Sequence, residues 1–485
     1  MTGRYSKTFL VLSLFLYSAS SVQAQKNYKD LSYSELGDIQ IPSIKRFTLT
    51  NGIKLFLLED HELPLINLSG RLRCGSIYEP SEKIGLASIT GVVMRTGGST
   101  TRPGDLVDEL LENIAASVET RISENSALVS MSVLKQDLDT GLNILSDILM
   151  DPAFPEEKIR LAKIEERSAV ARRNDSAGGI ARREFKKLIY GKDSPYARHT
   201  EYATIDSISR EDLVNFHKKY FHPNNMWLAV WGDFETKEMI DHLEKIFQNW
   251  KPKELQFSEV PLVNYEYRQT LNFIQKNDVN QSNIFIGHIG GVMSDEDYFA
   301  LTLMNRILGS GFTSRLFREV RSRQGLAYSV FGAYTAYYDH PGILYLGCQT
   351  KSETTVKAIN SMMNEVKKIT LSEVTDEELK IARESYLNSF VFNFDSTSEI
   401  VNRLMTYAYF GYPLDFLQKS KDRIEQVTKA DILKVAKKHL RPNQMQILVV
   451  GQLQNQDQSL SALGSVNQIK ISIPNPKGKS STATP

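Results

Sequence analysis

Two stretches of this chain repeat one another, and the repeat constrains the fold more than any other feature. Residues 205–234 and 424–453 align without a gap at an offset of 219 residues, and nine aligned positions are identical. Each copy reads as a capped helix, a Pro-Asn turn and a buried strand that ends at glycine. Upstream, Glu157 recurs as Glu377 at nearly the same offset. Solenoid repeats are only about 20–45 residues long, so the pattern indicates two homologous domains.

The repeat predicts an α+β protein made by internal duplication, in which each domain has a mostly antiparallel sheet with helices packed on one face. The chain has 485 residues, which is long enough for two domains of ordinary size. The predicted divisions are a signal peptide (1–24), a lead-in (25–44), an N-terminal domain (45–250), a linker (251–267), a C-terminal domain (268–455) and a disordered tail (456–485).

Local periodicity predicts several elements of the first domain. Asn51-Gly52 is a hairpin turn signal within Phe47–Leu58. Alternating apolar residues predict strands at Ser117–Ile122 and Ala127–Leu134. Apolar residues at helical spacing predict four helices: Ile84–Met94, Pro103–Ile114, Asp137–Leu149 and Pro155–Arg173.

The N-terminus has the composition of a secretory signal peptide. Arg4 and Lys7 precede the apolar run Phe9–Leu16, and Val22-Gln23-Ala24 is a small-residue cleavage site. A mitochondrial transit peptide would be rich in arginine, and this segment is not. We therefore expect an exported protein, periplasmic or secreted, whose mature chain begins near Gln25.

Composition disfavours two classes of partner. The 58 Lys+Arg residues are balanced by 57 Asp+Glu, so the chain as a whole has no field that would attract nucleic acid. No later apolar run reaches about 18 residues, so we expect no stable membrane insertion. Cys74 and Cys348 could form one disulfide, but two separate core thiols are the favoured prediction.

The stretch Gly309–Val330 combines a helix, a stop and a strand. Apolar spacing predicts a helix that stops at Gly325, and alternation predicts a strand that contains Tyr328. Arg321 would then lie in the last helical turn, where its guanidinium and the Tyr328 hydroxyl could reach one peptide carbonyl. Spacing alone leaves a plain alternative, a basic helix followed by an ordinary strand.

Together with the repeat and the signal peptide, this stretch makes the chain resemble the insulinase-like M16 metallopeptidases. The resemblance covers nearly all of the mature chain. LTNGIKLFLLEDHELPLINLSGRLRCGSIYEP followed by GLA is similar to the opening pattern of the family, and SRLFREVRSRQGLAYSV is similar to its C-terminal signature. The resemblance implies one half of a clamshell. It also implies that Arg321 and Tyr328, seven residues apart as in the family, contact the substrate beside a zinc ion.

The metal motif of the family is missing. Catalytic members have His-x-x-Glu-His after Gly-Leu-Ala, whereas this chain has Ser88 and Val92 at the histidine positions and Gly91 at the glutamate position. The third ligand, a glutamate, would fall within residues 168–173, which contain no carboxylate. Three carboxylates flank that range and are expected on a solvated face: Glu165, Glu166 and Asp175.

The spacing of the histidines predicts no replacement metal site, because no two of them are four residues apart on one helical face. The eight are His61, His199, His217, His222, His242, His288, His340 and His439. His217 and His222 come nearest to ligand spacing, and both are expected at the surface.

The resemblance therefore implies a non-catalytic subunit that binds no cofactor itself. We expect a heterodimer with a zinc-binding M16-type subunit, in which Arg321 and Tyr328 contact a peptide substrate in trans. Residues of the strand after the degenerate motif are expected to pair with the substrate backbone: Ser117, Val118, Glu119 and Thr120. One alternative is a peptide-binding or scaffold protein without hydrolysis. Another is a hydrolase with unrelated metal ligands.

Overall fold

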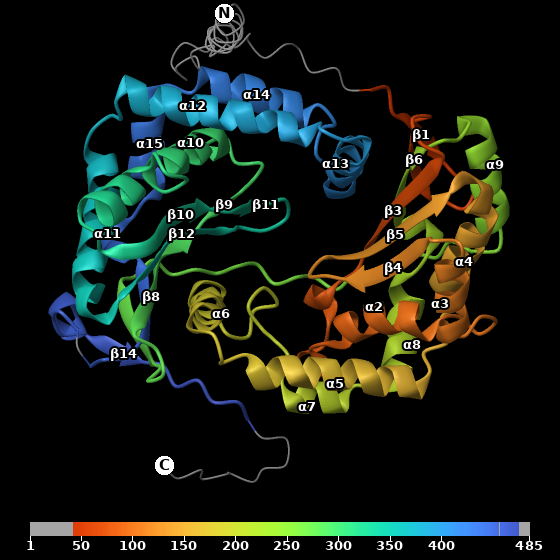
Figure 1. The fold of residues 1–485 in the computed structure, drawn as a ribbon, viewed down its shortest axis with the longest axis horizontal. Helices are drawn as coiled ribbons and strands as arrows, with labels where there is room; N and C mark the ends of the chain where they lie inside the picture. Colours follow the sequence, from red (N-terminus) through yellow and green to blue (C-terminus); the bar gives the residue numbers. More distant parts are fainter. Residues whose placement is uncertain (1–41, 455, 475–485) are drawn as a thin grey trace, which may run out of the picture. The chain divides into compact units, whose positions relative to one another are not determined.

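The computed structural model describes residues 42–454 and 456–474, so the predicted signal peptide and most of the lead-in lie outside the described residues (Figure 1). The first half of the chain forms a six-stranded mixed sheet in the order β1-β2-β6-β3-β5-β4. Its strands are β1 Lys45–Thr48, β2 Lys54–Glu59, β3 Leu65–Arg73, β4 Ser117–Ile122, β5 Ser126–Leu134 and β6 Met226–Gly232.

The second half forms another six-stranded sheet, in the order β10-β12-β8-β13-β7-β14. Its strands are β7 Thr270–Gln275, β8 Gln281–Ile289, β10 Ala327–Tyr334, β12 Ile343–Lys351, β13 Gln446–Gly451 and β14 Val466–Gln468, and the short strands β9 Gly291–Val292 and β11 Ala336–Tyr337 pair separately. The orders β2-β6-β3-β5-β4 and β7-β13-β8-β12-β10 match, and β2/β6 and β7/β13 are both parallel pairs. This agreement confirms the duplication.

Helix α8 before β6 corresponds to helix α15 before β13, in keeping with the sequence repeat. The first half contains α2 Leu86–Gly97, α3 Gly104–Asn113, α4 Leu138–Met150, α5 Glu156–Arg172, α6 Ala177–Tyr190, α7 Tyr202–Ser207, α8 Arg210–Tyr220 and α9 Thr236–Phe247. The second half contains α10 Tyr298–Leu308, α11 Thr355–Leu371, α12 Asp376–Phe390, α13 Thr397–Phe410, α14 Phe416–Gln426 and α15 Lys429–His439. The predicted α+β class is confirmed, with two mixed sheets packed against helices.

The two halves exchange one helix each, which sequence periodicity did not predict. Helix α6 packs on β8 and β13 of the second sheet, where Phe185 joins a core with Ile274 and Phe285. Reciprocally, α13 packs on β2 and β6 of the first sheet through Val401 and Met405. The expectation that helices cover only one face of each sheet is therefore wrong. One helix of each half packs on the second face of the other half's sheet (Figure 1).

A further contact joins the turn between β4 and β5 to the loop between β11 and β12. Asn125 Nδ2 donates to Asp339 Oδ2 at 3.1 Å. The neighbouring imidazole of His340 is 4 % exposed and lies between the rings of Tyr196 and Tyr337, with centroids 3.9 and 4.4 Å away. The two halves are thus joined by buried polar and aromatic contacts as well as by the exchanged helices.

Several local predictions are confirmed and two are wrong. The hairpin forms with Gly52 at φ +99°, and β4 has the predicted bounds. Cys74 and Cys348 are both free and buried. His217 is buried instead of exposed, and its Nε2 lies 2.9 Å from the Leu149 carbonyl. The expected solvation of Glu166 also fails, because it bonds to α2 as described below.

The predicted disorder of the tail is wrong for residues 456–474. Within this segment β14 pairs in parallel with β7 and so closes that edge of the second sheet. Ile469 N then donates to the Phe273 carbonyl at 2.8 Å. Short polar strands give little periodic signal, since only alternate residues need an apolar partner. Within the described part of the chain, no helix is long and apolar enough to cross a membrane.

Candidate functional site

Helix α2 carries the three positions of the degenerate motif. Its start is held by a buried carboxylate: Glu79 accepts hydrogen bonds from the backbone N–H groups of Gly85 and Ala87, and Gly85 has φ +107°. Orphan N–H groups at a helix start favour such a partner. Burial nevertheless raises the pKa of Glu79 to about 7.

Ser88 lies against a carboxylate that sequence reasoning placed on a solvated face. Ser88 Oγ donates to Glu166 Oε1 of α5 at 2.7 Å. The expectation for Glu166 is corrected because α5 packs directly on α2. A single carboxylate among charged neighbours on a helix carries no periodic signal for such a contact, so the sequence alone could not have selected it.

Gly91 is packed against the backbone of β4. A Cβ placed on Gly91 would lie 2.5 Å from the backbone nitrogen of Ile122 and 3.0 Å from the carbonyl carbon of Arg121. The hydroxyl of Thr120 also donates to the Gly91 carbonyl at 2.6 Å. The volume that a glutamate side chain would need at this position is therefore already filled by the strand.

The residues at this position do not fit a zinc ion. Neither Ser88 nor Val92 presents an imidazole, thiolate or carboxylate, and Glu166 alone supplies one oxygen donor pair. Across residues 42–454 and 456–474, no group of three or more His, Cys, Asp or Glu side chains could hold a metal ion. No chemistry that passes through a metal on α2 can be derived for this chain.

Strand β4, predicted to pair with the substrate, lies at the edge of the first sheet, as expected. Helix α2 packs closely against it. Arg95 Nε donates to the Val118 carbonyl at 2.5 Å and lies 3.8 Å from Glu119 Oε1. At the end of β4, Ser76 N donates to the Ser123 carbonyl at 3.0 Å. Several groups along β4 thus have partners within the chain, and its pairing with a substrate stays a prediction.

Arg321 and Tyr328 lie on two consecutive irregular elements. Arg321 is in the π-helical segment η6 Phe317–Arg323, where Gln324 N donates five residues back to the Glu319 carbonyl at 3.1 Å. Single π-helical turns are frequent at functional sites. Gly325 follows at φ +62°, so the left-handed stop predicted at this glycine is confirmed.

Tyr328 is the extra residue of a β-bulge in the edge strand β10. Ala327 pairs with Thr350 and Ser329 pairs with Gln349, so Tyr328 has no residue opposite it. Its side chain is 72 % exposed. Bulges at sheet edges commonly redirect a side chain.

The Arg321 side chain is exposed too, and its guanidinium lies 4.9 Å from the centroid of the Phe317 ring. Among the described residues, it has no carboxylate within ion-pair distance. The structure therefore presents an arginine and a tyrosine on packed neighbouring elements, both accessible from solution.

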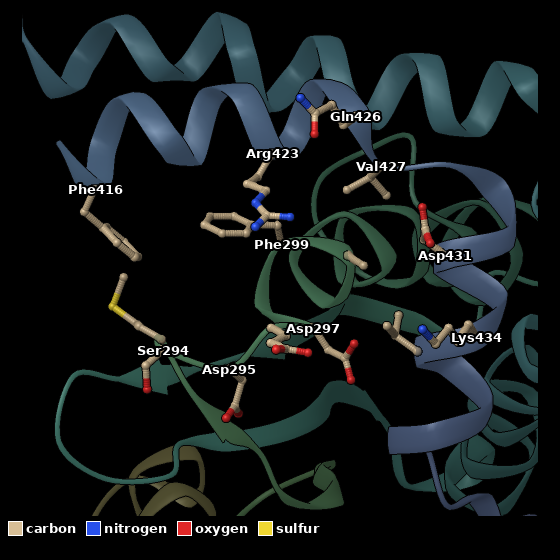
Figure 2. A pocket seen from close by; sticks show the side chains of 14 residues that line it. Ser294, Asp295, Asp297, Phe299, Phe416, Arg423, Gln426, Val427, Asp431 and Lys434 are labelled. Carbon is tan, nitrogen blue, oxygen red and sulfur yellow. The ribbon is translucent and has the colours of Figure 1, made fainter. Parts of the chain in front are cut away.

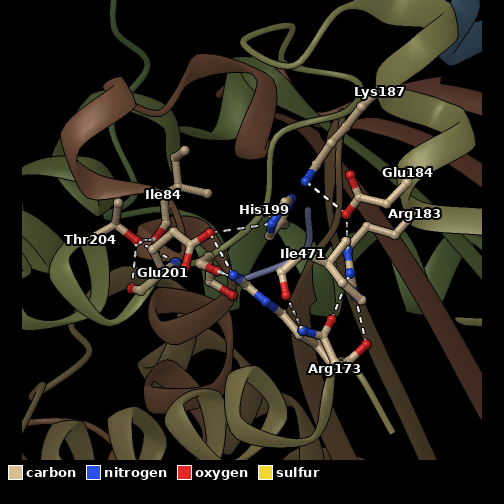
Figure 3. A network of polar contacts seen from close by, with 11 residues as sticks. Ile84, Arg173, Arg183, Glu184, Lys187, His199, Glu201, Thr204 and Ile471 are labelled. Carbon is tan, nitrogen blue, oxygen red and sulfur yellow. Dashed lines mark hydrogen bonds and ion pairs between the residues drawn. The ribbon is translucent and has the colours of Figure 1, made fainter. Parts of the chain in front are cut away.

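A polar network lies where α5 ends, next to the range predicted for the third ligand (Figure 3). Arg173, the last residue of that range, donates to Glu201 Oε1 at 2.8 Å and to the Thr200 carbonyl at 3.0 Å. Arg183 of α6 donates to the Arg173 carbonyl at 2.6 Å, so the network ties α6 to the end of α5. The guanidinium of Arg173, with a carboxylate and a carbonyl as partners, therefore lies at the end of the range in which the family has its third zinc ligand.

The pocket in Figure 2 has a volume of about 650 Å³ and lies between the start of α10 and helices α14 and α15. Its carboxylate Asp297 accepts from Lys438 Nζ at 2.6 Å and from His439 Nε2 at 2.7 Å. Neither Arg321 nor Tyr328 lines it. The pocket is separate from the candidate site.

The fold and the site define a duplicated α+β protein in which the residues on α2 do not fit a zinc ion. Two models of one family match the chain: insulinase (peptidase family M16) over residues 71–180, and the peptidase M16 inactive domain over residues 207–386. This chain belongs to peptidase family M16 and has its two-domain organisation.

Individual relatives are named either as uncharacterized zinc proteases or as a non-peptidase homolog. The chain is 24% identical over 425 residues to the Helicobacter pylori protein named non-peptidase homolog YmxG, covering 87% of this chain and 94% of that one. It is 25% identical over 334 residues to an uncharacterized zinc protease of Rickettsia felis, covering 68% and 79%.

Solved structures share the fold. A peptidase M16 inactive domain from Pseudomonas fluorescens matches with a TM-score of 0.76 at 22% identity, covering 85% of this chain and 99% of that one. A protease from Helicobacter pylori matches with a TM-score of 0.73 at 17% identity, covering 84% and 99%.

Proposed function

We propose that this chain is the non-catalytic subunit of an exported M16-type zinc peptidase. It contributes Arg321 and Tyr328 to a peptide-hydrolysing site whose zinc belongs to a partner subunit. The observation that carries the proposal is that both side chains are accessible on irregular elements. In contrast, α2 has neither histidine ligand of the motif, and β4 fills the space that the catalytic glutamate would need at Gly91.

The chemistry available to this chain is binding and orientation. A guanidinium offers five N–H donors in a planar fork, and a phenol offers one O–H donor. Aimed at a peptide carbonyl, these donors would stabilise negative charge that develops on its oxygen. They cannot activate a water molecule, so hydrolysis requires the partner.

The test is peptidase activity of the purified chain, of an M16-type protein with intact His-x-x-Glu-His from the same source, and of their mixture. We expect activity in the mixture. Arg321→Ala should lower its kcat/KM by about 10²- to 10³-fold, the loss typical of a removed oxyanion donor, and Tyr328→Phe should lower it less. Arg323→Ala is the matched control, because this exposed arginine of the same helix pairs with Glu319.

Full activity of the partner alone, unchanged by this chain or by its variants, would contradict the proposal. The Helicobacter pylori relative named a non-peptidase homolog favours a second candidate, a peptide-binding or scaffold protein without any hydrolytic role. Peptide binding by this chain with no gain of activity in the mixture would support that second function.

A further inference from the structure

One face of the first sheet gathers positive charge along a single row of residues. Strand register places Lys54 of β2 opposite Trp227 of β6, Trp227 opposite Arg71 of β3, Arg71 opposite Leu128 of β5, and Leu128 opposite Arg121 of β4. Residues directly opposite one another across paired strands point to the same face of the sheet. The row therefore crosses five strands with three cations.

A fourth cation, Arg73, lies two residues beyond Arg71 on β3 and so shares its face. Arg73 and Arg121 are exposed, and Arg71 is half-buried. Helix α13 covers this face over β2 and β6, whereas the opposite face of β5 packs against α4. The C-terminal end of α13 also reaches β3, where the guanidinium groups of Arg71 and Arg73 lie 5.3 and 5.7 Å from the ring centroid of Tyr409. Over β4, Arg121 is exposed.

None of these four cations has a carboxylate within ion-pair distance in the described part of the chain, in contrast to Arg173, Arg183 and Arg315. Arg71 Nη1 donates to Ser126 Oγ at 3.2 Å, but its buried Nε has no hydrogen-bond partner within residues 42–454 and 456–474. Arg121 has neither a side-chain hydrogen bond nor an ion pair among those residues. Such an arrangement leaves donors available for a ligand.

Nearby carboxylates are engaged elsewhere. Glu119, one row along on the same face of β4, lies 3.8 Å from Arg95 Nε. Glu124, in the turn after β4, lies 3.9 Å from Lys186 Nζ and 3.7 Å from His340 Nε2. The cationic row is therefore not neutralised by the acids of adjacent strands.

Mutual repulsion is visible at two members of the row. Burial lowers the pKa of Arg71 most, the nearby Tyr409 and Tyr338 act against this, and the Arg121 charge lowers it further. Burial and then the Arg73 charge lower the pKa of Lys54. Bringing these charges together costs free energy in the unliganded chain, and an anion on this face would offset that cost.

A purely structural role accounts for part of the row. Arg73 Nη2 donates to the Tyr409 carbonyl at 3.3 Å, near the C-terminus of α13, where cations are favoured. Lys54 Nζ lies 3.9 Å from the Trp227 ring centroid. Arg71 also lies over the rings of Tyr409 and Phe410 at the end of α13, 5.3 and 6.0 Å from their centroids. These contacts leave the Nε of Arg71 without a hydrogen-bond partner among the described residues and do not involve Arg121, so the end of α13 does not explain the whole row.

We propose that Arg71, Arg73 and Arg121 form a binding site for acidic peptides, whose carboxylates they pair with on the face of β3, β5 and β4 beside the end of α13. Arg71 and Arg121 are two strand spacings apart, about 10 Å, which suits two carboxylates of one extended peptide. The site lies on the half of the molecule that carries the degenerate motif on α2. This inference rests on the proposed function in one respect: it names acidic peptides as the substrates that the partner subunit would hydrolyse.

Binding is tested with the full mature chain alone, so the result does not depend on a catalytic partner. Fluorescence anisotropy would compare two labelled peptides of equal length, identical except that the glutamates of one are glutamines in the other. We expect the acidic peptide to bind more tightly and to lose affinity as salt is raised. The double variant Arg71→Gln/Arg121→Gln should weaken its binding by about tenfold or more.

Two further variants keep the test decisive. Arg121→Glu changes an exposed side chain, should fold normally, and should abolish or reverse the preference between the acidic peptide and a lysine-containing counterpart. Arg160→Gln removes an exposed arginine of α5 away from the row and should change nothing. Equal affinity for the two original peptides, an equal loss in the α5 control, or equally strong binding of a single-stranded oligonucleotide would overturn the proposal.

Discussion

Restoring the family motif on α2 is expected to destabilise the protein without creating a zinc site. In the variant Ser88→His/Gly91→Glu/Val92→His, the new glutamate would have to displace the β4 backbone, which lies 2.5 Å from the Cβ position of residue 91. Overpacking alone costs about 1–3 kcal/mol, and a buried carboxylate without a partner adds to that cost. We expect the free energy of unfolding to fall by about 3 kcal/mol or more, with no stoichiometric zinc in the purified protein.

Single alanine substitutions isolate the steric part of this prediction. Gly91→Ala should lower the free energy of urea unfolding by about 1–3 kcal/mol, because even a methyl group meets the strand backbone. Gly179→Ala is the matched control on α6, where the nearest atoms to a new Cβ lie at ordinary contact distance, 3.6 Å. A helical glycine with room for a side chain usually gains about 0.4–1 kcal/mol on this change.

Opposite results would refute this account of α2. If the triple variant binds one zinc ion per chain and unfolds at the wild-type urea concentration, β4 can move away cheaply and the site is only a few substitutions from activity. If Gly91→Ala and Gly179→Ala have the same effect, the close approach of α2 to β4 does not limit the packing.

Gly91 also shows what sequence reasoning could and could not reach. The loss of ligands was readable from residue types, because serine, glycine and valine do not bind zinc. The approach of β4 was not readable, since a glycine in a helix pattern has several explanations. Likewise, the repeat predicted two matching sheets, and Asn51-Gly52 predicted the hairpin, because these signals are local or internal to the sequence.

The exchange of α6 and α13 marks the limit of local pattern. Both helices have ordinary apolar faces, and periodicity does not say which sheet an apolar face will meet. The same holds for the contact of Ser88 with Glu166, two residues 78 positions apart in the chain. The irregular geometry at Tyr328 was hidden too, since a bulge is one extra residue in an otherwise regular strand pattern.

Glu79 should make the stability of the protein fall as the pH rises toward neutrality. Glu79 as a whole residue is 5 % exposed, and burial raises the pKa of its carboxyl to about 7, against about 4.3 in an unfolded chain. The folded state therefore holds the proton more tightly than the unfolded state. The stabilisation is complete below about pH 4 and is lost progressively up to about pH 7.

The size of this effect follows from the shift of the pKa. Each unit corresponds to about 1.4 kcal/mol, so Glu79 should account for about 3 kcal/mol between the two ends of that pH range. Hydrogen bonds from Gly85 and Ala87 to the ionised carboxylate act against the shift and are already included in it. Urea unfolding at a series of pH values would measure the slope.

Glu79→Gln removes the titrating group and keeps a carbonyl oxygen that can accept from the start of α2. We expect this variant to lose the decline between about pH 4 and about pH 7. Near pH 8 its stability should equal or exceed that of the wild type, because no ionised carboxyl is buried there. Glu82→Gln, an exposed acid on the same loop, should retain the wild-type slope. A wild-type profile that rises with pH over this range would mean that the ionised carboxylate of Glu79 stabilises α2, and that its two backbone hydrogen bonds outweigh burial.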